Sequence, residues 1–205
     1  MDPHTQEPAI INTEQHGAVL VLPDDWWVIP LEPVAERNKS IKNLIEKQVG
    51  KLDVDVRLRK DMRAQLEDVT EAAASKGGVL YAISLMEAGD YPIAATLTIY
   101  REDTELESVR VRLIMQGAGA VASELEFSPV YRTLTVESGP GELDAEELKQ
   151  LVAQYWLEPH DSHGVLHAVF STPHLEVQDA MLAMFDAIVG SITTDGIEPE
   201  MSGSD

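Results

Sequence analysis

The chain has 205 residues, 44% of them hydrophobic, and its 36 Asp and Glu against 15 Lys and Arg give a formal net charge of −21, a composition that predicts one globular domain. It has no cysteine, which excludes disulfides, thiolate nucleophiles and Cys-ligated zinc and suits a reducing cytoplasm. Because so acidic a surface repels phosphate backbones and anionic lipid headgroups, we expect neither nucleic acid nor a membrane as a partner.

The two ends of the chain differ from its middle. The first twenty residues lack the basic start and apolar core of a secretory signal, and no apolar run approaches the ~18 residues of a membrane span. We therefore expect a cytoplasmic protein. Residues 1–17 and the acidic segment 195–205 are polar and lack hydrophobic periodicity, so both are predicted to be flexible tails around a single domain at 18–194.

The domain opens with two short apolar runs, residues 18–22 and 26–31, separated by Pro23-Asp24-Asp25. This pattern predicts a hairpin. Neighbouring side chains of a strand point to opposite faces, so Trp26 and Trp27 cannot share a surface. Either the strand is covered by apolar material on both faces, or one tryptophan is exposed and contacts a partner.

Residues 41–49 and 58–73 repeat apolar side chains at helical spacing and end at glycines, which predicts two amphipathic helices or one interrupted helix. Residues 37–63 also hold nine Lys and Arg against four Asp and Glu, leaving −26 on the rest of the chain. The basic side chains, among them Lys42, Lys47, Arg59 and Arg63, form either an internally neutralised, solvated face or a docking face for a partner.

From residue 79 the apolar period changes from helical spacing to alternation. Residues 79–86 and 91–100 predict a second hairpin around the turn 87–90, and 109–115 and 127–136 predict further strands. Residues 142–150 suggest a brief helix, and 151–157 with 165–171 predict a third hairpin. Thr172-Pro173 then starts a helix whose apolar stripe runs from Val177 to Ile192 and must be buried.

Hairpins with helices inserted early and placed last predict an α+β fold, a mainly antiparallel sheet with helices packed on both faces, an α/β/α sandwich. The segments LPDDWWVIPL and FSTP followed by AMFDAIVGSI resemble the opening and closing motifs of the PsbP-like fold. That fold is shared by a photosystem extrinsic subunit and a Ran-binding nuclear import factor. The resemblance, which spans about residues 18–193, implies a fold and a binding or assembly role, with no catalytic residue to carry over.

Two local patterns bear on chemistry. His160, His163, His167 and His174 lie within fifteen residues, and imidazoles so spaced can share a zinc or nickel ion if three or four ligands converge. Gly117 to Ala122 matches the G-x-G-x-x-A form of a dinucleotide loop, but the required helix does not follow, so a small-residue loop is predicted.

These observations predict a non-enzymatic protein-interaction or assembly module without a cofactor, whose partner is another protein. One of Trp26 and Trp27, together with Lys42, Lys47, Arg59 and Arg63, is predicted to contact that partner. Two alternatives stay open: an acidic chaperone or inhibitor of a basic client, and a metal-dependent enzyme using His160, His163 and His167. The sequence leaves the oligomeric state open.

Overall fold

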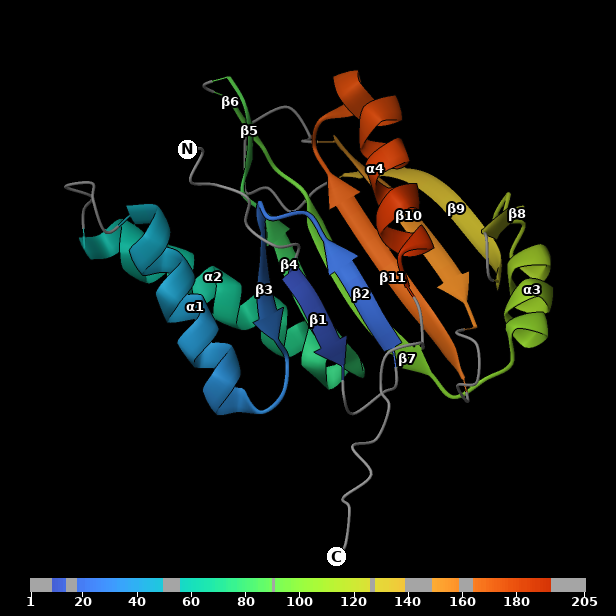
Figure 1. Cartoon of the computed structure of the whole chain (residues 1–205), viewed down its shortest axis with the longest axis horizontal. Helices are drawn as coiled ribbons and strands as arrows, with labels where there is room; N and C mark the ends of the chain where they lie inside the picture. The colour runs from blue at the N-terminus through green and yellow to red at the C-terminus, as the bar shows by residue number, and fades with distance from the viewer. Residues whose placement is uncertain are drawn as a thin grey trace, which may run out of the picture.

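A seven-stranded antiparallel sheet in the order β3-β4-β7-β11-β10-β9-β8 forms the centre of the protein (Figure 1). The computed structural model describes residues 9–13, 18–49, 56–89, 91–125, 128–138, 149–158 and 164–192. Along the sheet the strands are β3 (Trp26–Pro30), β4 (Gly78–Ser84), β7 (Thr96–Glu102), β11 (Val165–Thr172), β10 (Lys149–Leu157), β9 (Ser128–Ser138) and β8 (Val121–Leu125). Two separate ribbons pair β1 (Ala9–Thr13) with β2 (Ala18–Leu22) and β5 (Met86–Ala88) with β6 (Tyr91–Ile93).

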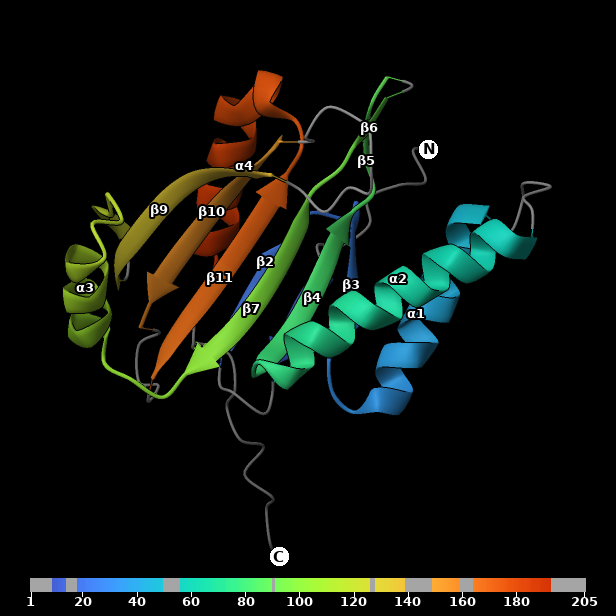
Figure 2. The ribbon, with the colours of Figure 1, turned by 180° about the vertical axis from the view of Figure 1, so that it is seen from behind.

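Helices lie on both faces of the sheet. They are α1 (Val34–Val49), α2 (Val56–Ser75), α3 (Leu106–Met115) and α4 (Gln178–Gly190), the last preceded by a 3₁₀ turn at Leu175–Val177. The β1–β2 ribbon and α4 cover one face (Figure 1), and α1, α2 and α3 cover the other, with α1 and α2 at one side and α3 at the opposite side (Figure 2). The predicted α+β class with helices on both faces is therefore confirmed.

The alternation of side chains along the strands divides the apolar residues between two main cores. Trp26 belongs to the core beneath α4, and Trp27 packs against the core beneath α1 and α2. In the first core the rings of Phe170 and Phe185 stack with centroids 4.4 Å apart, which joins the sheet to α4. Both faces of β3 are thus covered by apolar material, as its adjacent tryptophans predict.

A polar contact also fixes α4 on the sheet. Arg132 on β9 donates two hydrogen bonds of 2.8 Å to the carboxylate of Asp186, and the buried Tyr155 hydroxyl donates a third of 2.9 Å. Burial and the Asp186 charge raise the pKa of Tyr155, so this phenol stays a donor. At the end of α4, Ser191 Oγ accepts from the Val21 amide at 3.1 Å and so ties the helix to β2.

Two predictions for the beginning of the chain were wrong. The segment 1–17, expected to be a flexible tail, contains strand β1, which pairs with β2 in antiparallel register. The hairpin predicted between residues 18–22 and 26–31 was also wrong. Strand β2 pairs with β1, and β3 pairs with β4. The Pro23 turn therefore carries the chain from a ribbon above the sheet into the edge of the sheet and makes no hairpin.

The strand predicted at 109–115 was also wrong, since Leu106–Met115 form helix α3. The stretch alternates apolar and basic residues, but Leu106, Val109 and Leu113 also recur at helical spacing, and these three are the buried ones. They pack against Trp156 and Val165 of the sheet. The helical spacing of residues 106, 109 and 113, rather than the alternation, therefore corresponds to the side chains that are buried.

The remaining elements agree with the sequence patterns where the structure describes them. Helices α1 and α2, the β4–β7 pairing, strand β9, the β10–β11 hairpin and helix α4 are confirmed. The turn at 159–163, most of the predicted helix at 142–150 and the tail at 195–205 lie outside the described residues.

Candidate functional site

A cleft of about 930 Å³ lies between the C-terminal half of α1, the middle of α2 and strand β4. Its lining is mainly apolar. The residues are Leu44, Ile45, Gln48 and Val49 of α1, Met62, Gln65, Leu66, Asp68 and Val69 of α2, and Tyr81, Ile83 and Leu85 on and after β4. Its size and apolar lining are those of ligand-binding pockets.

The cleft exists because α2 packs shallowly on the sheet. Of the 20 residues of α2, all of which the structure describes, Thr70 and Ala73 alone are buried, whereas Leu58 is 51% and Val69 42% exposed. The shorter α1 buries five. A surface helix normally gains its stability by burying its apolar face, so the apolar face of α2 is only half used within this chain.

The C-terminal end of α2 is held close to the sheet by a glycine. A Cβ atom on Gly78, at the start of β4, would lie 2.7 Å from the Ala73 carbonyl oxygen and 2.7 Å from Leu31 Cδ1. Only a residue without a side chain permits this approach. In Figure 2, α2 crosses the sheet obliquely from this point. The residues of α2 that line the cleft lie between 62 and 69, N-terminal to the buried Thr70 and Ala73.

The ionisable groups that line the cleft are Asp68 and Tyr81. Burial raises the pKa of the Tyr81 phenol, so it is neutral at physiological pH and can act only as a hydrogen-bonding group. Asp68 is exposed at the helix surface. The cleft therefore offers apolar contact area with one negative charge beside it.

The two tryptophans, one of which was predicted to contact a partner, have different environments. Trp26 is 4% exposed and its ring meets Phe170 edge-on at 6.5 Å, so it is a core residue, and Trp27 is the one left for the predicted contact. Trp27 is half-buried, donates from Nε1 to Ser40 Oγ at 3.0 Å, and has Lys47 Nζ 5.2 Å from its ring centroid. Trp27 thus anchors α1 to β3 while keeping some exposed area.

The four basic residues predicted to dock a partner each have a contact within the chain. Lys47 lies over Trp27, Lys42 is 3.8 Å from Glu46, and Arg63 donates to Glu67 at 2.7 Å. Arg59 Nη2 donates to the Val49 carbonyl at 3.0 Å, which satisfies the C-terminal end of α1. Two of these contacts, those of Lys42 and Arg63, are ion pairs with acidic side chains; a role of the four residues in docking stays a prediction.

Of the predicted metal ligands, the structure places His167 alone, because His160 and His163 lie outside the described residues. The His167 ring stacks on Trp156 at 4.5 Å, and its two nitrogens face Gln154 Oε1 at 3.0 Å and Glu102 Oε1 at 3.3 Å. Burial lowers the pKa of His167 to about 4. Among the described residues no group of three or more His, Asp or Glu is arranged to hold a metal ion.

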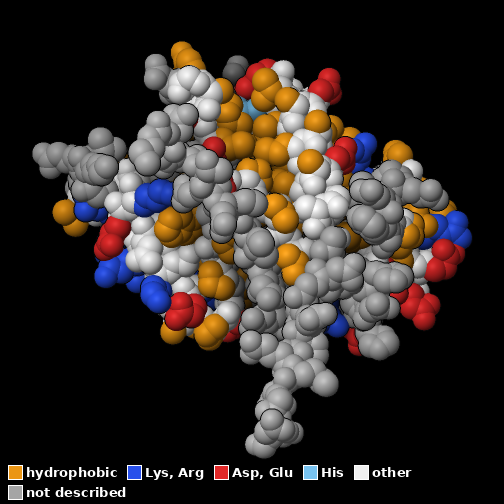
Figure 3. Space-filling view, viewed as in Figure 1, with side chains coloured by type: hydrophobic (Ala, Val, Ile, Leu, Met, Phe, Trp, Pro, Cys, Tyr) orange, Lys and Arg blue, Asp and Glu red, His pale blue; other side chains and the backbone are white. Residues whose placement is uncertain are grey.

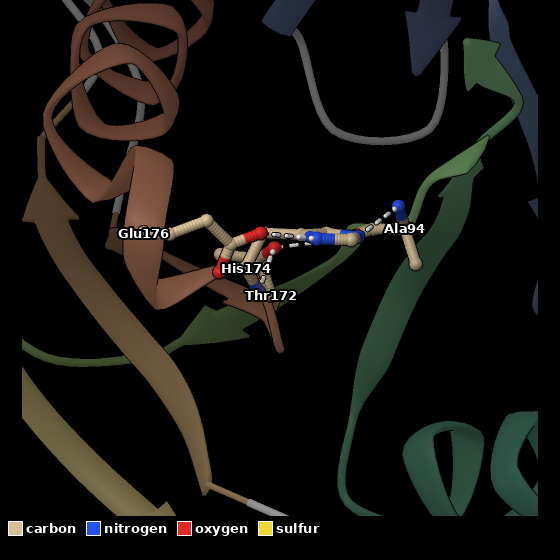
Figure 4. A network of polar contacts seen from close by, with 4 residues as sticks. All are labelled: Ala94, Thr172, His174 and Glu176. Carbon is tan, nitrogen blue, oxygen red and sulfur yellow. Dashed lines mark hydrogen bonds and ion pairs between the residues drawn. The ribbon is translucent and has the colours of Figure 1, made fainter. Parts of the chain in front are cut away.

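His174 takes part in a network that joins the start of α4 to the loop before β7 (Figure 4). Its Nε2 accepts from the Ala94 amide at 3.0 Å, its Nδ1 faces Glu176 Oε1 at 3.1 Å, and Thr172 Oγ1 donates to the Ala94 carbonyl at 2.8 Å. This histidine and carboxylate resemble an acid–base pair. However, the group that faces His174 Nε2 is the backbone amide of Ala94, which is not a nucleophile. We therefore interpret these contacts of Ala94, Thr172, His174 and Glu176 as structural and call them the clamp.

The clamp holds the β5–β6 ribbon beside α4. Figure 3 shows apolar side chains between that ribbon and α4, and Met86, Ile93 and Met184 are half-buried residues packed on the core beneath. This surface is continuous with the first core.

No family model matches the chain, and no curated protein matches its sequence. In the parts of the chain that the structure describes, no helix is both long enough and apolar enough to cross a membrane. The cleft must therefore be interpreted from its own geometry.

Sequence reasoning located the elements that form the cleft but missed the cleft itself. The sequence places Leu58, Met62, Leu66 and Val69 in one apolar stripe, and the structure leaves Leu58 and Val69 exposed. The stripe itself gives no signal of this, because at about 100° per residue these four side chains span roughly 80°, which is the arc of an ordinary buried face.

Proposed function

We propose that this protein is a non-enzymatic interaction module that holds an apolar segment of another protein in the cleft between α1, α2 and β4. The observation that carries the proposal is the packing of α2, which buries two of its 20 residues although its apolar residues flank a cleft of about 930 Å³. A partner segment in the cleft would complete the burial of Met62, Leu66 and Val69.

The chemistry of the lining favours binding over catalysis. General acid–base catalysis needs two groups able to exchange a proton near the operating pH, or a nucleophile activated by a base. The cleft presents a protonated phenol, Tyr81, and one exposed carboxylate, Asp68. Its remaining lining can supply contact area and amide hydrogen bonds, which are what a recognition site requires.

A photo-crosslinking residue at position 69 tests this function directly. Val69 is 42% exposed, so a crosslinker there replaces little buried contact; the matched control is Val177, which is 40% exposed and precedes α4 on the other face. We expect a crosslinked protein partner at position 69 and none at 177. Equal crosslinking at both positions, or none at 69 with the native partner present, would contradict the proposal.

Substitution of the same positions gives a binding measurement. With the crosslinked protein purified, Val69→Lys should weaken the complex about tenfold or more, because a charge would enter an apolar contact, and Val177→Lys should leave it unchanged. The double charge reversal Lys42→Glu with Lys47→Glu should weaken binding and flatten its salt dependence if the predicted basic docking face takes part. Unchanged affinity of that double variant would restrict the interface to the cleft.

A further inference from the structure

The border of the cleft along α2 has the spacing of a helix-pairing seam. Leu58, Met62, Gln65 and Val69 follow one another at intervals of four, three and four residues, the intervals by which helices in coiled coils meet. Leu58 and Val69 are half-exposed, whereas Thr70 and Ala73 on the inner side are buried. A second helix, rather than an extended strand, is the shape that matches such a seam.

Two acidic residues lie beside the seam. Asp61 and Asp68, seven residues apart, lie on the same exposed flank of α2, next to Gln65 of the seam, and Arg57 precedes Asp61 by one turn on that flank. Arg59 and Arg63 lie on the opposite flank, where Arg59 bonds to the Val49 carbonyl and Arg63 to Glu67. Asp68 is also the charged residue that lines the cleft.

The net charge of the whole chain also favours a cationic partner. A formal net charge of −21 attracts cationic partners and repels acidic ones at distances beyond direct contact. The basic side chains of α1 and α2 reduce this field locally, and the contacts described for them are with other groups of the chain: Leu31, Glu36, Glu46, Trp27, Val49 and Glu67. Asp68 at the cleft and the net charge of the chain therefore favour the same kind of partner.

We propose that the cleft binds a basic amphipathic helix of the partner protein. Its apolar stripe packs along Leu58, Met62 and Val69, and its Lys or Arg side chains reach Asp61 and Asp68. The seam from 58 to 69 is about 16 Å long at 1.5 Å per residue, so the bound helix has at least about three turns. This inference rests on the proposed function and adds the shape and charge of the segment that the cleft accepts.

Synthetic helical peptides test the inference without the native partner. Three peptides of about 16 residues suffice: a leucine stripe with lysine flanks, the same stripe with glutamate flanks, and the lysine composition with the stripe scrambled. Fluorescence anisotropy measures their binding to the full chain, to Asp68→Lys, and to Asp179→Lys. Asp179 is exposed at the start of α4 on the other face, so its reversal changes the net charge equally and away from the cleft.

The expected result is that the lysine-flanked peptide binds about tenfold more tightly than the glutamate-flanked one and that scrambling abolishes binding. Asp68→Lys should weaken the lysine-flanked peptide about fivefold, and Asp179→Lys less than about twofold. If Asp68→Lys and Asp179→Lys weaken binding equally, or if the scrambled peptide binds as tightly as the lysine-flanked one, the interaction depends on net charge alone and the inference is overturned.

The same experiment separates this inference from the proposed function. If the glutamate-flanked peptide binds better and Val69→Lys abolishes that binding, the cleft is a helix site of the opposite charge preference, and the inference alone fails. If no peptide binds and position 69 gives no crosslink to a partner, both fail. If the neutral dye Nile red binds the cleft, is lost in Val69→Lys, and no peptide competes with it, the occupant is a small apolar molecule, which also overturns the inference.

Discussion

Replacing Phe185 by alanine should destabilise the protein more than any exposed substitution, because this ring joins α4 to the sheet. Phe185 is fully buried and stacks on Phe170, which in turn meets Tyr155 edge-on at 5.6 Å. Removing the ring leaves a void between two layers that are fixed on either side by the Asp186 contact and the β2 contact. The surroundings therefore cannot collapse freely into the space.

The cost follows from the burial. A buried Phe→Ala change costs about 3 to 5 kcal/mol, the sum of lost transfer free energy and the residual cavity. We expect the upper half of that range, since the aromatic contact with Phe170 is lost as well. For a domain of this size each kcal/mol lowers Tm by about 2 to 4 °C, so a cost of about 4 to 5 kcal/mol should lower Tm by roughly 8 to 20 °C.

Urea denaturation followed by circular dichroism measures this free energy, and calorimetry measures Tm. Val177→Ala is the matched control, because Val177 directly precedes the same helix but is 40% exposed, and it should change the free energy of unfolding by less than about 0.5 kcal/mol. A Phe185→Ala protein with wild-type stability would show that the α4 stripe does not carry the packing of this layer, and the reasoning about the first core would be refuted.

Three further substitutions test other contacts. Asp186→Ala should cost about 1 to 2 kcal/mol of unfolding free energy, because it leaves a buried tyrosine hydroxyl and a half-buried arginine without their acceptor; unchanged stability in urea would contradict this. Gly164→Ala should cost about 1 to 3 kcal/mol, since Gly164 has φ +98° and its Cβ would lie 2.7 Å from the Glu102 carbonyl oxygen; a thermal melt equal to wild type would rule the strain out. His167 has a native pKa of about 4 against 6.5 when exposed, so the unfolded chain binds the proton first and stability falls as pH drops from 6.5 to 4. In His167→Phe the loss of stability between pH 6.5 and 4 should be smaller. Parallel curves of unfolding free energy against pH for the two proteins would show that His167 does not cause this loss.

The elements with one strong period were predictable from sequence. In α4 the apolar residues Met181, Phe185, Ile188 and Val189 recur at helical spacing without an opposing pattern, and the same residues are buried in the structure. In β10 and β11 the apolar runs, separated by a turn segment, likewise indicated both strands and their pairing. In such segments local pattern and tertiary burial select the same conformation, so no outside information is needed.

The failures occurred where two patterns coexist or where the partner lies far away. Residues 109–113 fit both an alternating and a helical apolar pattern. The helix is the conformation in which Val109 and Leu113 pack against Trp156 and Val165, which lie more than 40 residues later in the chain. Strand β1 has five residues, AIINT, too few to show a clear alternation, and within the described residues it pairs with β2. Such choices depend on long-range contacts, which no local pattern contains.

The candidate site illustrates a different limit, because the local structure of α2 was predictable and the cleft beside it was not. An apolar stripe that faces the sheet and one that stays accessible beside a cleft have the same spacing. Only burial distinguishes them: Ala73 lies against the sheet, whereas Leu58 and Val69 remain accessible. On our proposal, the apolar surface that stays accessible after folding is the surface that binds the partner, and Asp61 and Asp68 beside it favour a basic one.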